Sequence, residues 1–220
     1  MGSTERVPDE PEHHADLSMA PRGSLRVVSA TSELTRGSLR GHHEGPIMQA
    51  SVFISTSLDG FIARPNGDID WLPSGGGEEH GYDAFIATVD ALVIGRKTYE
   101  TVLAFDPWPY GEKPVFVLST GALAPAPPGA VVEHMSGAPA GIVSQLAARG
   151  VRQVYVDGGN TIQRFLQAGL IQRLIITRIP VLIGSGIPLF GPLQGDIVLR
   201  HVGTRQYASG LVQSEYLVAA

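Results

Sequence analysis

The chain has 220 residues, is 43% hydrophobic, carries a net charge of −5 and contains no cysteine, a composition typical of a globular protein of one or two domains. The lack of cysteine excludes disulfides, thiolate nucleophiles and cysteine metal sites, and it agrees with a cytoplasmic location. Lysine occurs only at Lys97 and Lys113, so no basic stripe is available for nucleic acid, and no apolar run is long enough for a membrane span.

Residues 1–47 are rich in Ser, Gly, Pro, Glu, Arg and His and show neither helical nor strand periodicity. A segment of this composition cannot bury enough apolar surface to fold. We therefore predict a disordered N-terminal extension over residues 1–47 and a folded domain over residues 48–220. The histidines of the extension form two pairs, which we interpret as solvated side chains, and we predict no metal site.

Beyond Met48, short β-branched runs alternate with helix-like segments. The runs are "ASVFIS", "ALVIG", "PVFVLS", "AVVEH" and "QVYVDG". Residues 136–150 predict a helix with Pro139 in its first turn and Gly150 as its stop. Residues 160–170 predict another, with Asn160 as the cap and Gly169 as the stop. This alternation favours an α/β domain with a largely parallel sheet.

The C-terminal part carries strand patterns without helices between them. Residues 171–184, 196–208 and 210–219 predict long strands, and the last two predict a hairpin that turns at Ser209 and Gly210. Antiparallel strands after a parallel part indicate a mixed sheet in one domain.

Candidate ligand-binding residues lie where strands end and helices begin. In "VIGRKTYE", Arg96 and Lys97 follow Gly95 at a predicted helix start, which already carries positive charge, so an anion is expected there. An ordinary solvated pair of cations is the alternative. Gly158 and Gly159 lie at a second such turn, and Ser119 and Thr120 at a third. Together these turns favour a phosphorylated dinucleotide, although the Rossmann pattern GxGxxG is missing.

Five segments, in this order and spacing, resemble the dihydrofolate reductase superfamily. They are "SVFISTSLDGFIARPNGDIDWL", "VIGRKTYE", "VFVLST", "VYVDGGNTI" and "ITRIPVLIGSGIPLF". The closer resemblance is to the branch that includes the reductase domain of the bacterial riboflavin-pathway enzyme, the RibD C-terminal type. It implies a three-layer α/β fold with a mixed, mostly parallel sheet of about eight strands, flanking helices and a C-terminal antiparallel hairpin.

The resemblance also implies NADPH as the cofactor. It places Ile62 and Ala63 beside the nicotinamide. In relatives the peptide between the two glycines of the second turn is cis. The residues that match the phosphate-binding positions of the family are Gly95, Arg96, Lys97, Thr98, Ser119, Thr120, Gly158, Gly159, Asn160 and Thr161.

The proton donor of the family has no clear match here. Folate-reducing relatives carry an acid shortly after a Trp-x-x-Pro motif, whereas this chain has Trp71, Leu72 and Pro73 followed by glycines. The candidates that remain are Asp70, Glu79 and Asp83, and the alternative for each is a solvated carboxylate at a helix start. The arginine that binds the glutamate tail of folate is replaced by Lys113.

The predicted function is an NADPH-dependent reductase that transfers hydride to a C=N or C=O carbon of a small pterin-like or pyrimidine-like heterocycle. The candidates for substrate contact are Trp71, Phe85, Trp108, Lys113 and Thr177, with ordinary packing as the alternative for the aromatic residues. Two other functions stay open: the riboflavin-pathway reduction of a ribosylamino-uracil phosphate, and non-catalytic nucleotide binding. Homodimers are common in this branch, so a homodimer is a further expectation.

Overall fold

The computed structural model describes residues 48–73 and 80–219. Contacts within the chain separate residues 1–42 from residues 43–220, and the fold described below belongs to the second unit. Residues 1–47, 74–79 and 220 lie outside the described residues. The predicted N-terminal extension and the candidate acid Glu79 therefore have no structural description.

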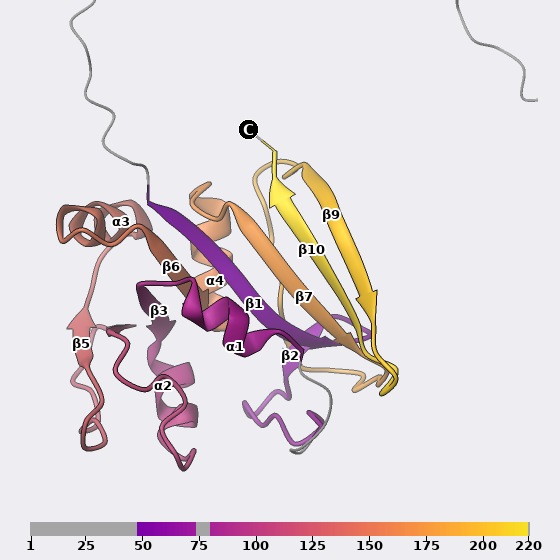
Figure 1. Cartoon of the computed structure of the whole chain (residues 1–220), viewed down its shortest axis with the longest axis horizontal. Helices are drawn as coiled ribbons and strands as arrows, with labels where there is room; N and C mark the ends of the chain where they lie inside the picture. Colours follow the sequence, from indigo (N-terminus) through magenta and orange to yellow (C-terminus); the bar gives the residue numbers. More distant parts are fainter. Residues whose placement is uncertain (1–47, 74–79, 220) are drawn as a thin grey trace, which may run out of the picture. The chain divides into compact units, whose positions relative to one another are not determined.

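An eight-stranded sheet forms the centre of the domain, with the strand order β5-β4-β3-β6-β1-β7-β10-β9 (Figure 1). The strands from β5 to β7 in this order are parallel, and β10 is antiparallel to both β7 and β9. The predicted mixed, mostly parallel sheet is confirmed. The bounds are β1 Gln49–Ser57, β3 Ala91–Gly95, β4 Val115–Leu118, β5 Val132–Met135, β6 Gln153–Asp157, β7 Arg173–Ile179, β9 Leu199–Gln206 and β10 Val212–Val218.

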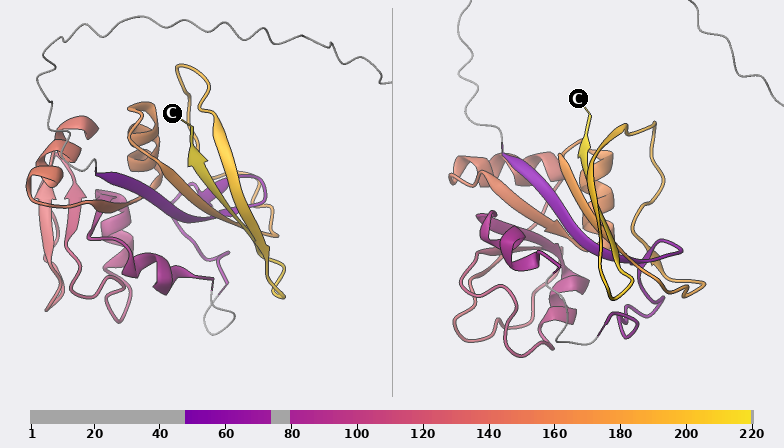
Figure 2. Two further views of the ribbon diagram at one scale, coloured as in Figure 1. Left: turned by 45° about the horizontal axis from the view of Figure 1, so that its top comes forward. Right: turned by 45° about the vertical axis from the view of Figure 1, so that its right-hand side comes forward.

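Helices pack on both faces of this sheet, as predicted for a three-layer fold (Figure 2). One face carries α3 (Pro139–Ala148) and α4 (Gly159–Gln167), whose buried Leu146 and Phe165 pack in one core cluster with the sheet residue Val154. The other face carries α1 (Tyr82–Ala87) and α2 (Arg96–Val102), which pack in a second cluster. All parallel strands end at one edge of the sheet, here named the carboxyl edge, where α2 and α4 begin. No helix of the described residues has the length and apolarity that a membrane crossing needs.

A second, two-stranded sheet joins β2 (Phe61–Ala63) to β8 (Ile187–Pro188). Asp59, in the turn before β2, ties this sheet to the main one. Its carboxylate accepts hydrogen bonds from the backbone N–H groups of Ile183 (3.1 Å) and Gly184 (2.8 Å), which lie between β7 and β8. The loops that follow β1 and β7 are therefore held together at the carboxyl edge.

The predicted helix ends are confirmed, with one exception. Pro139 is the first residue of α3, and Gly150 and Gly169 end their helices with positive φ angles of 88° and 67°. The prediction of Asn160 as a cap is wrong, because α4 begins one residue earlier, after Gly158 with φ 93° and ψ 136°. No side chain supplies the cap there, and Asn160 is exposed in the first helical turn.

The peptide bond between Gly158 and Gly159 is trans, whereas the resemblance implied a cis bond there, and the cis bond within the described residues is Asp106–Pro107. The chain turns here through the positive φ of Gly158 instead of a cis bond. Glycine adopts this conformation without steric strain.

The predicted C-terminal hairpin is confirmed. β9 and β10 pair in antiparallel register from Val212↔Gln206 to Val218↔Leu199. The N–H of Tyr207 donates to the carbonyl of Leu211 at 3.0 Å, which closes the loop, and Gly210 turns the chain with φ 85°. β10 is thereby held against β7, and β9 forms the outer edge of the sheet.

Candidate active site

The first turns of α2 and α4 face each other across glycine backbone at the carboxyl edge. A Cβ atom on Gly158 would overlap the Oγ1 atom of Thr98, and it would lie 3.8 Å from the backbone nitrogen of Gly95. A Cβ atom on Gly95 would lie 2.9 Å from Oγ1 of Thr161. No side chain fits at either glycine. The structure thus brings four predicted residues together into a site lined by backbone and two hydroxyl groups, which we name the glycine cradle (Gly95, Thr98, Gly158 and Thr161).

The cradle has the chemistry of a phosphate site. Glycine lets a ligand approach the backbone closely, and N–H groups at a helix start are not bonded within the helix. Two helix starts contribute partial positive charge, and threonine hydroxyls donate further hydrogen bonds. The cradle can therefore hold an anion between α2 and α4.

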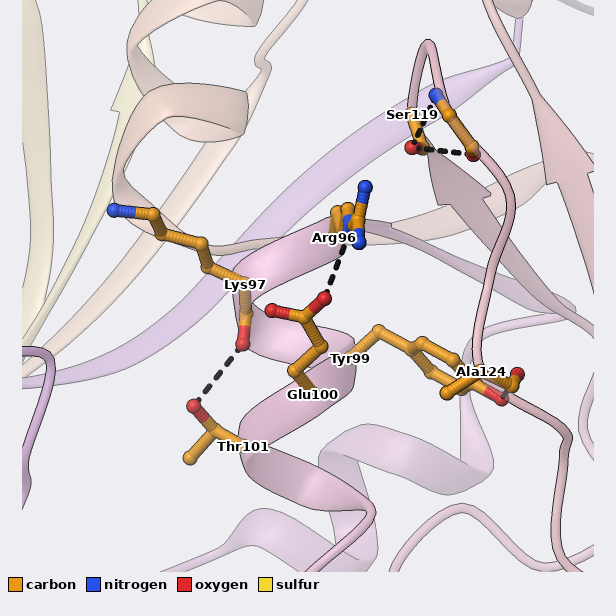
Figure 3. Close-up of polar contacts among 8 residues, drawn as sticks. Arg96, Lys97, Tyr99, Glu100, Thr101, Ser119 and Ala124 are labelled. Carbon is orange, nitrogen blue, oxygen red and sulfur yellow. Dashed lines mark hydrogen bonds and ion pairs between the residues drawn. The ribbon is translucent and has the colours of Figure 1, made fainter.

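The two adjacent cations of α2 point in different directions (Figure 3). The Nε atom of Arg96 donates to Oε1 of Glu100 at 2.8 Å, one turn later in the helix. The guanidinium of Arg96 also reaches the turn after β4, because a Cβ atom on Gly121 would lie only 3.1 Å from its Nη1 atom. Lys97 is exposed and leaves the helix on the other side. Arg96 and Lys97 therefore serve separate positions and do not form one cationic pair.

The turn after β4 is ordered by Ser119. Its hydroxyl donates to the carbonyl of Gly121 at 2.8 Å and accepts from the N–H of the same residue at 3.0 Å. A ring nitrogen of His134 lies 2.7 Å from the carbonyl oxygen of Ser119. Thr120 is exposed. Ser119 thus shapes the turn, and Arg96 brings the positive charge to it.

Ile62 and Ala63 lie on β2, beside the cradle. A Cβ atom on Gly159 would lie 3.0 Å from Cδ1 of Ile62 and 3.1 Å from Cγ2 of Ile187. Ala63 is buried, and it pairs with Ile187 in the small sheet. The small sheet therefore supplies an apolar wall next to the first turn of α4.

Two of the acids predicted from the sequence, Asp70 and Asp83, do not suit proton donation. The carboxylate of Asp70 accepts a hydrogen bond from Nε of Arg64, and this bond holds the pKa of Asp70 below its ordinary value. Asp70 is therefore an exposed, ionised partner of Arg64. Asp83 is exposed in the first turn of α1, where a carboxylate is favoured by the helix dipole. Glu79 lies outside the described residues.

A different carboxyl group, which the sequence analysis missed, lies next to the cradle. Asp157 is the last residue of β6 and directly precedes Gly158, whose N–H donates to its Oδ1 atom at 2.7 Å. Burial raises the pKa of Asp157 to about 6, although the hydrogen bond from Gly158 acts against the rise. The signal in the sequence was an acid at the end of an apolar strand and before two glycines.

The charge of Asp157 acts on three tyrosines. Burial, followed by the charge of Asp157, raises the pKa of Tyr82 to about 12. The pKa values of Tyr110 and Tyr155 are also raised, first by burial and then by Asp157. The Tyr155 hydroxyl donates to the carbonyl of Phe53 at 2.8 Å. All three phenols are therefore neutral at physiological pH, and Asp157 is the group among them that titrates.

Further aromatic rings pack against Tyr82 and Tyr155. Phe53 contacts Tyr82 edge-on at 5.6 Å between ring centroids, and the ring of Phe85 lies 5.0 Å from that of Phe53. Phe85 is buried and packs against Tyr155, so packing is its observed role. Trp108 packs against Tyr110 at 5.2 Å, and its indole N–H has no partner among the described residues.

Lys113, which the sequence assigned to the substrate, lies elsewhere. It precedes β4 at the opposite edge of the sheet, and its Nζ atom donates to the carbonyl of Val89 at 2.7 Å. That prediction is wrong because the ammonium group satisfies a carbonyl between α1 and β3.

The remaining predicted contacts are Thr177 and Trp71. Thr177 is buried on β7, and its hydroxyl accepts a hydrogen bond from Nε2 of Gln213 at 2.9 Å. The same Gln213 nitrogen donates to the carbonyl of His80 at 2.9 Å. Thr177 therefore belongs to a hydrogen-bond network with the segment that precedes α1. Trp71 is partly buried, and its indole N–H has no partner among the described residues.

A groove of about 410 Å³ lies away from all these residues. It is lined by residues from the end of α4, from the loop before β9 and from the end of β10, among them Leu166, Leu193 and Val218. Within the part of the chain that the structure describes, no group of three His, Asp or Glu side chains is placed to hold a metal ion.

Comparisons with known proteins agree with this geometry. The family model of the RibD C-terminal domain matches residues 50–213. The uncharacterised protein YwjB of Bacillus subtilis is 38% identical over 175 residues, which cover 76% of this chain and 97% of YwjB. A crystal structure from Shewanella sp. PV-4, of a protein provisionally named for riboflavin biosynthesis, is 40% identical with a TM-score of 0.72, and the match covers 79% of this chain and all of that one.

More distant structures share the fold. The deaminase/5-amino-6-(5-phosphoribosylamino)uracil reductase of Thermotoga maritima is 17% identical with a TM-score of 0.60, and the match covers 78% of this chain and 57% of that protein. Dihydrofolate reductase from Enterococcus faecalis, solved with NADP(H), is 16% identical with a TM-score of 0.54 and coverages of 80% and 98%. The fold predicted from the sequence is therefore confirmed.

Proposed function

Because the chain belongs to the RibD C-terminal domain family, we propose that it is a reductase that uses NADPH to reduce a C=N or C=O carbon of a small heterocyclic substrate. The observation that carries the proposal is the glycine cradle, in which α2 and α4 begin face to face and leave no space for a side chain. Such a site suits the pyrophosphate of a dinucleotide. The dihydrofolate reductase that shares the fold was solved with NADP(H).

The residues present fit NADPH at three positions. The cradle would hold the pyrophosphate with backbone N–H groups and the hydroxyls of Thr98 and Thr161. Arg96, at the turn after β4, would pair with the 2′-phosphate, because a guanidinium forms strong, charge-assisted hydrogen bonds with phosphate oxygens. Ile62 supplies apolar contact on the side of the small sheet. When bound, NADPH would supply the hydride, and the protein would position the substrate and provide a proton.

The first experiment measures binding of NADPH and NADH by the fluorescence of Trp71 and Trp108. We expect the wild-type protein to prefer NADPH. Arg96→Ala should weaken NADPH binding about 10-fold to 100-fold, the effect of losing one charged hydrogen bond, and leave NADH binding nearly unchanged. Arg149→Ala is the matched control, because Arg149 is an exposed arginine paired with Glu133 on another part of the surface.

Lys97→Ala provides a second arm of the experiment. Since Lys97 points away from the turn after β4, its loss should weaken NADPH and NADH equally, and its effect should fall at high salt. Equal affinity of the wild-type protein for the two cofactors would contradict the 2′-phosphate assignment. Failure to bind either one would overturn the proposed function.

A second candidate is the riboflavin-pathway reduction of a ribosylamino-uracil phosphate. It is favoured by the Shewanella relative, which is 40% identical and provisionally named for riboflavin biosynthesis. Loss of NADPH absorbance with pterin, quinone and ribosylamino-uracil acceptors would separate the two candidates. Binding of NADPH without turnover of any acceptor would instead favour a non-catalytic nucleotide-binding protein.

A further inference from the structure

Asp157 lies between the glycine cradle and the aromatic side chains described above. It pairs with Ile94 at the end of β3 and directly precedes Gly158 of the cradle. Tyr82 from α1 and Tyr110 from the loop after α2 lie near enough for their ionisation to respond to its charge. Asp157 is a partly exposed residue at the carboxyl edge of the sheet, where ligands bind in open α/β folds. A substrate placed beside the cofactor would therefore meet this carboxyl group.

We propose that Asp157 is the proton donor of the reductase, a role that rests on the proposed function. When bound, NADPH would supply the hydride that forms a C–H bond at the carbon of the C=N or C=O group, and the π electrons of the double bond would move to its nitrogen or oxygen. The carboxyl O–H of Asp157 protonates that atom. Asp157 is left as a carboxylate and regains its proton from water, while the cofactor leaves oxidised by two electrons.

The surroundings of Asp157 suit this role. A general acid works best when its pKa lies near the working pH, and burial raises the pKa of Asp157 to about 6. The titratable groups that face it are Tyr82, Tyr110 and Tyr155, all held neutral by burial. These groups include no carboxylate and no cation that could share the proton of Asp157. Asp157 can therefore be protonated in a useful fraction of molecules at neutral pH.

Other described acids near the predicted substrate contacts lack this combination. Asp70 is paired with Arg64 and stays ionised. Asp83 is exposed on α1 and makes no recorded contact with the cradle. Asp157 alone, among the described carboxylates, directly precedes a cradle glycine.

The first test does not need a substrate. Protein labelled with ¹³C at aspartate carboxyl groups is titrated by NMR, and the Asp157 signal is identified by its loss in Asp157→Asn. We expect a midpoint near pH 6 in the wild-type protein. A midpoint near the ordinary aspartate value of about 4 would overturn the proposal, because the group would then hold almost no proton at neutral pH. Asp90→Asn, which alters a carboxylate at the other end of β6, should leave the Asp157 signal unchanged.

The second test compares two kinds of hydride acceptor in the presence of NADPH. The fastest neutral acceptor of the panel described above must gain a proton, whereas the N-methylacridinium cation accepts hydride at carbon and needs none. Asp157→Asn should lower the rate with the neutral acceptor about 100-fold to 1,000-fold, the usual contribution of a general acid. It should change the acridinium rate less than about 3-fold. Asp157→Glu should recover part of the lost rate.

The pH dependence completes this test. With the neutral acceptor, kcat of the wild-type protein should fall about 10-fold per pH unit above the pKa of Asp157, and the Asp157→Asn profile should be flat. If the wild-type protein binds NADPH and reduces the acceptor but Asp157→Asn reduces it equally fast, the proton donor is another group and the proposed function survives. If the wild-type protein neither binds NADPH nor reduces any acceptor, the proposed function itself fails.

Discussion

Asp157 should destabilise the folded protein at neutral pH, since its carboxylate loses hydration among aromatic rings. Its folded-state pKa lies above its unfolded value, so the protonated form stabilises the fold at low pH. This contribution is complete below about pH 4 and is lost as the pH rises through about 6. The rise from 3.8 to about 6 corresponds to at most about 3 kcal/mol. A residue that weakens the fold where the cofactor would bind is typical of a functional site.

Asp157→Asn therefore provides a stability prediction that is independent of catalysis. The amide keeps an oxygen for the hydrogen bond from Gly158 N–H and carries no charge. The free energy of unfolding in urea should rise by about 1–3 kcal/mol at pH 7.5 and should not change below pH 4. Asp157→Glu, which keeps a titrating carboxyl group, should not give this gain. Equal stability of wild type and Asp157→Asn at both pH values would show that the carboxylate remains hydrated.

Gly158 offers a prediction about the cradle itself. Its φ of 93° and ψ of 136° are strained for any L side chain, and an added Cβ atom would overlap Oγ1 of Thr98. Gly158→Ala should lower the free energy of unfolding by about 2–4 kcal/mol and abolish NADPH binding. Adding Thr98→Ala removes the overlap but not the strained φ, so it should restore only part of the stability. Full recovery in the double variant would mean that backbone strain is negligible.

At the level of single residues, the sequence predicted the backbone site better than the side-chain chemistry. Gly95, Thr98, Gly158 and Thr161 could be found because turns between strands and helices meet at one edge of a parallel sheet. Lys113 was misassigned because its distance along the chain does not show which edge of the sheet it occupies. Asp157 was missed because its raised pKa comes from burial in the folded chain, which its position in the sequence does not show.

At the level of elements, periodicity was sufficient for most of the fold. The helices α3 and α4, the parallel strands and the hairpin β9–β10 each carry their own apolar pattern and stop signals. The start of α4 was misplaced because a glycine with positive φ precedes it, whereas the sequence offered Asn160 as an ordinary cap. The short strands β2 and β8 could not be predicted, since they pair only through the contact between two distant loops.

Asp59 provides a prediction about those two loops. Its carboxylate accepts hydrogen bonds from the N–H groups of Ile183 and Gly184, and a side-chain hydrogen bond from Ser57 is the main cause that keeps its pKa low. Asp59→Ala should therefore speed amide hydrogen exchange at Ile183 and Gly184 by about 10-fold or more, while core amides of β1 and β6 keep their protection. NADPH affinity should also fall, because Ile62 lies beyond this turn and contacts the cradle.

A useful control for Asp59→Ala is exchange in the wild-type protein below the pKa of Asp59. Protonation weakens the same hydrogen bonds, so acid should raise relative exchange at Ile183 and Gly184 in wild type but not in the variant. Unchanged exchange in Asp59→Ala would show that the pairing of β2 with β8 holds the loops without the carboxylate.

At the level of the whole molecule, the two faces of the sheet carry different kinds of side chain. The face of α3 and α4 is a mostly aliphatic core of residues such as Val52 and Val154. The face of α1 and α2 is richer in aromatic side chains, among them Phe85, Tyr110 and Tyr155. The cradle lies where both faces meet, because α2 begins on one and α4 on the other.

The first buried residue in the described chain is Met48, which is 5% exposed and packs with Val52 in the aliphatic core. The N–H of Gln49 donates to the carbonyl of Arg152 at 2.8 Å, so pairing with the sheet starts there. The family model also begins within this strand, at residue 50. A chain that starts at Met48 should therefore keep the melting temperature of the full chain within about 2 °C and bind NADPH equally well.

A second truncation makes this prediction specific. A chain that starts at Val52 lacks Met48 and Ala50 from the core and the first pairs between β1 and β6. Losing one buried methionine already lowers the free energy of unfolding by about 2–5 kcal/mol, so this chain should melt at least about 8 °C lower. Circular dichroism of the three chains measures both effects. A large loss of stability in the chain that starts at Met48 would mean that residues 1–47 contribute to the fold of the domain.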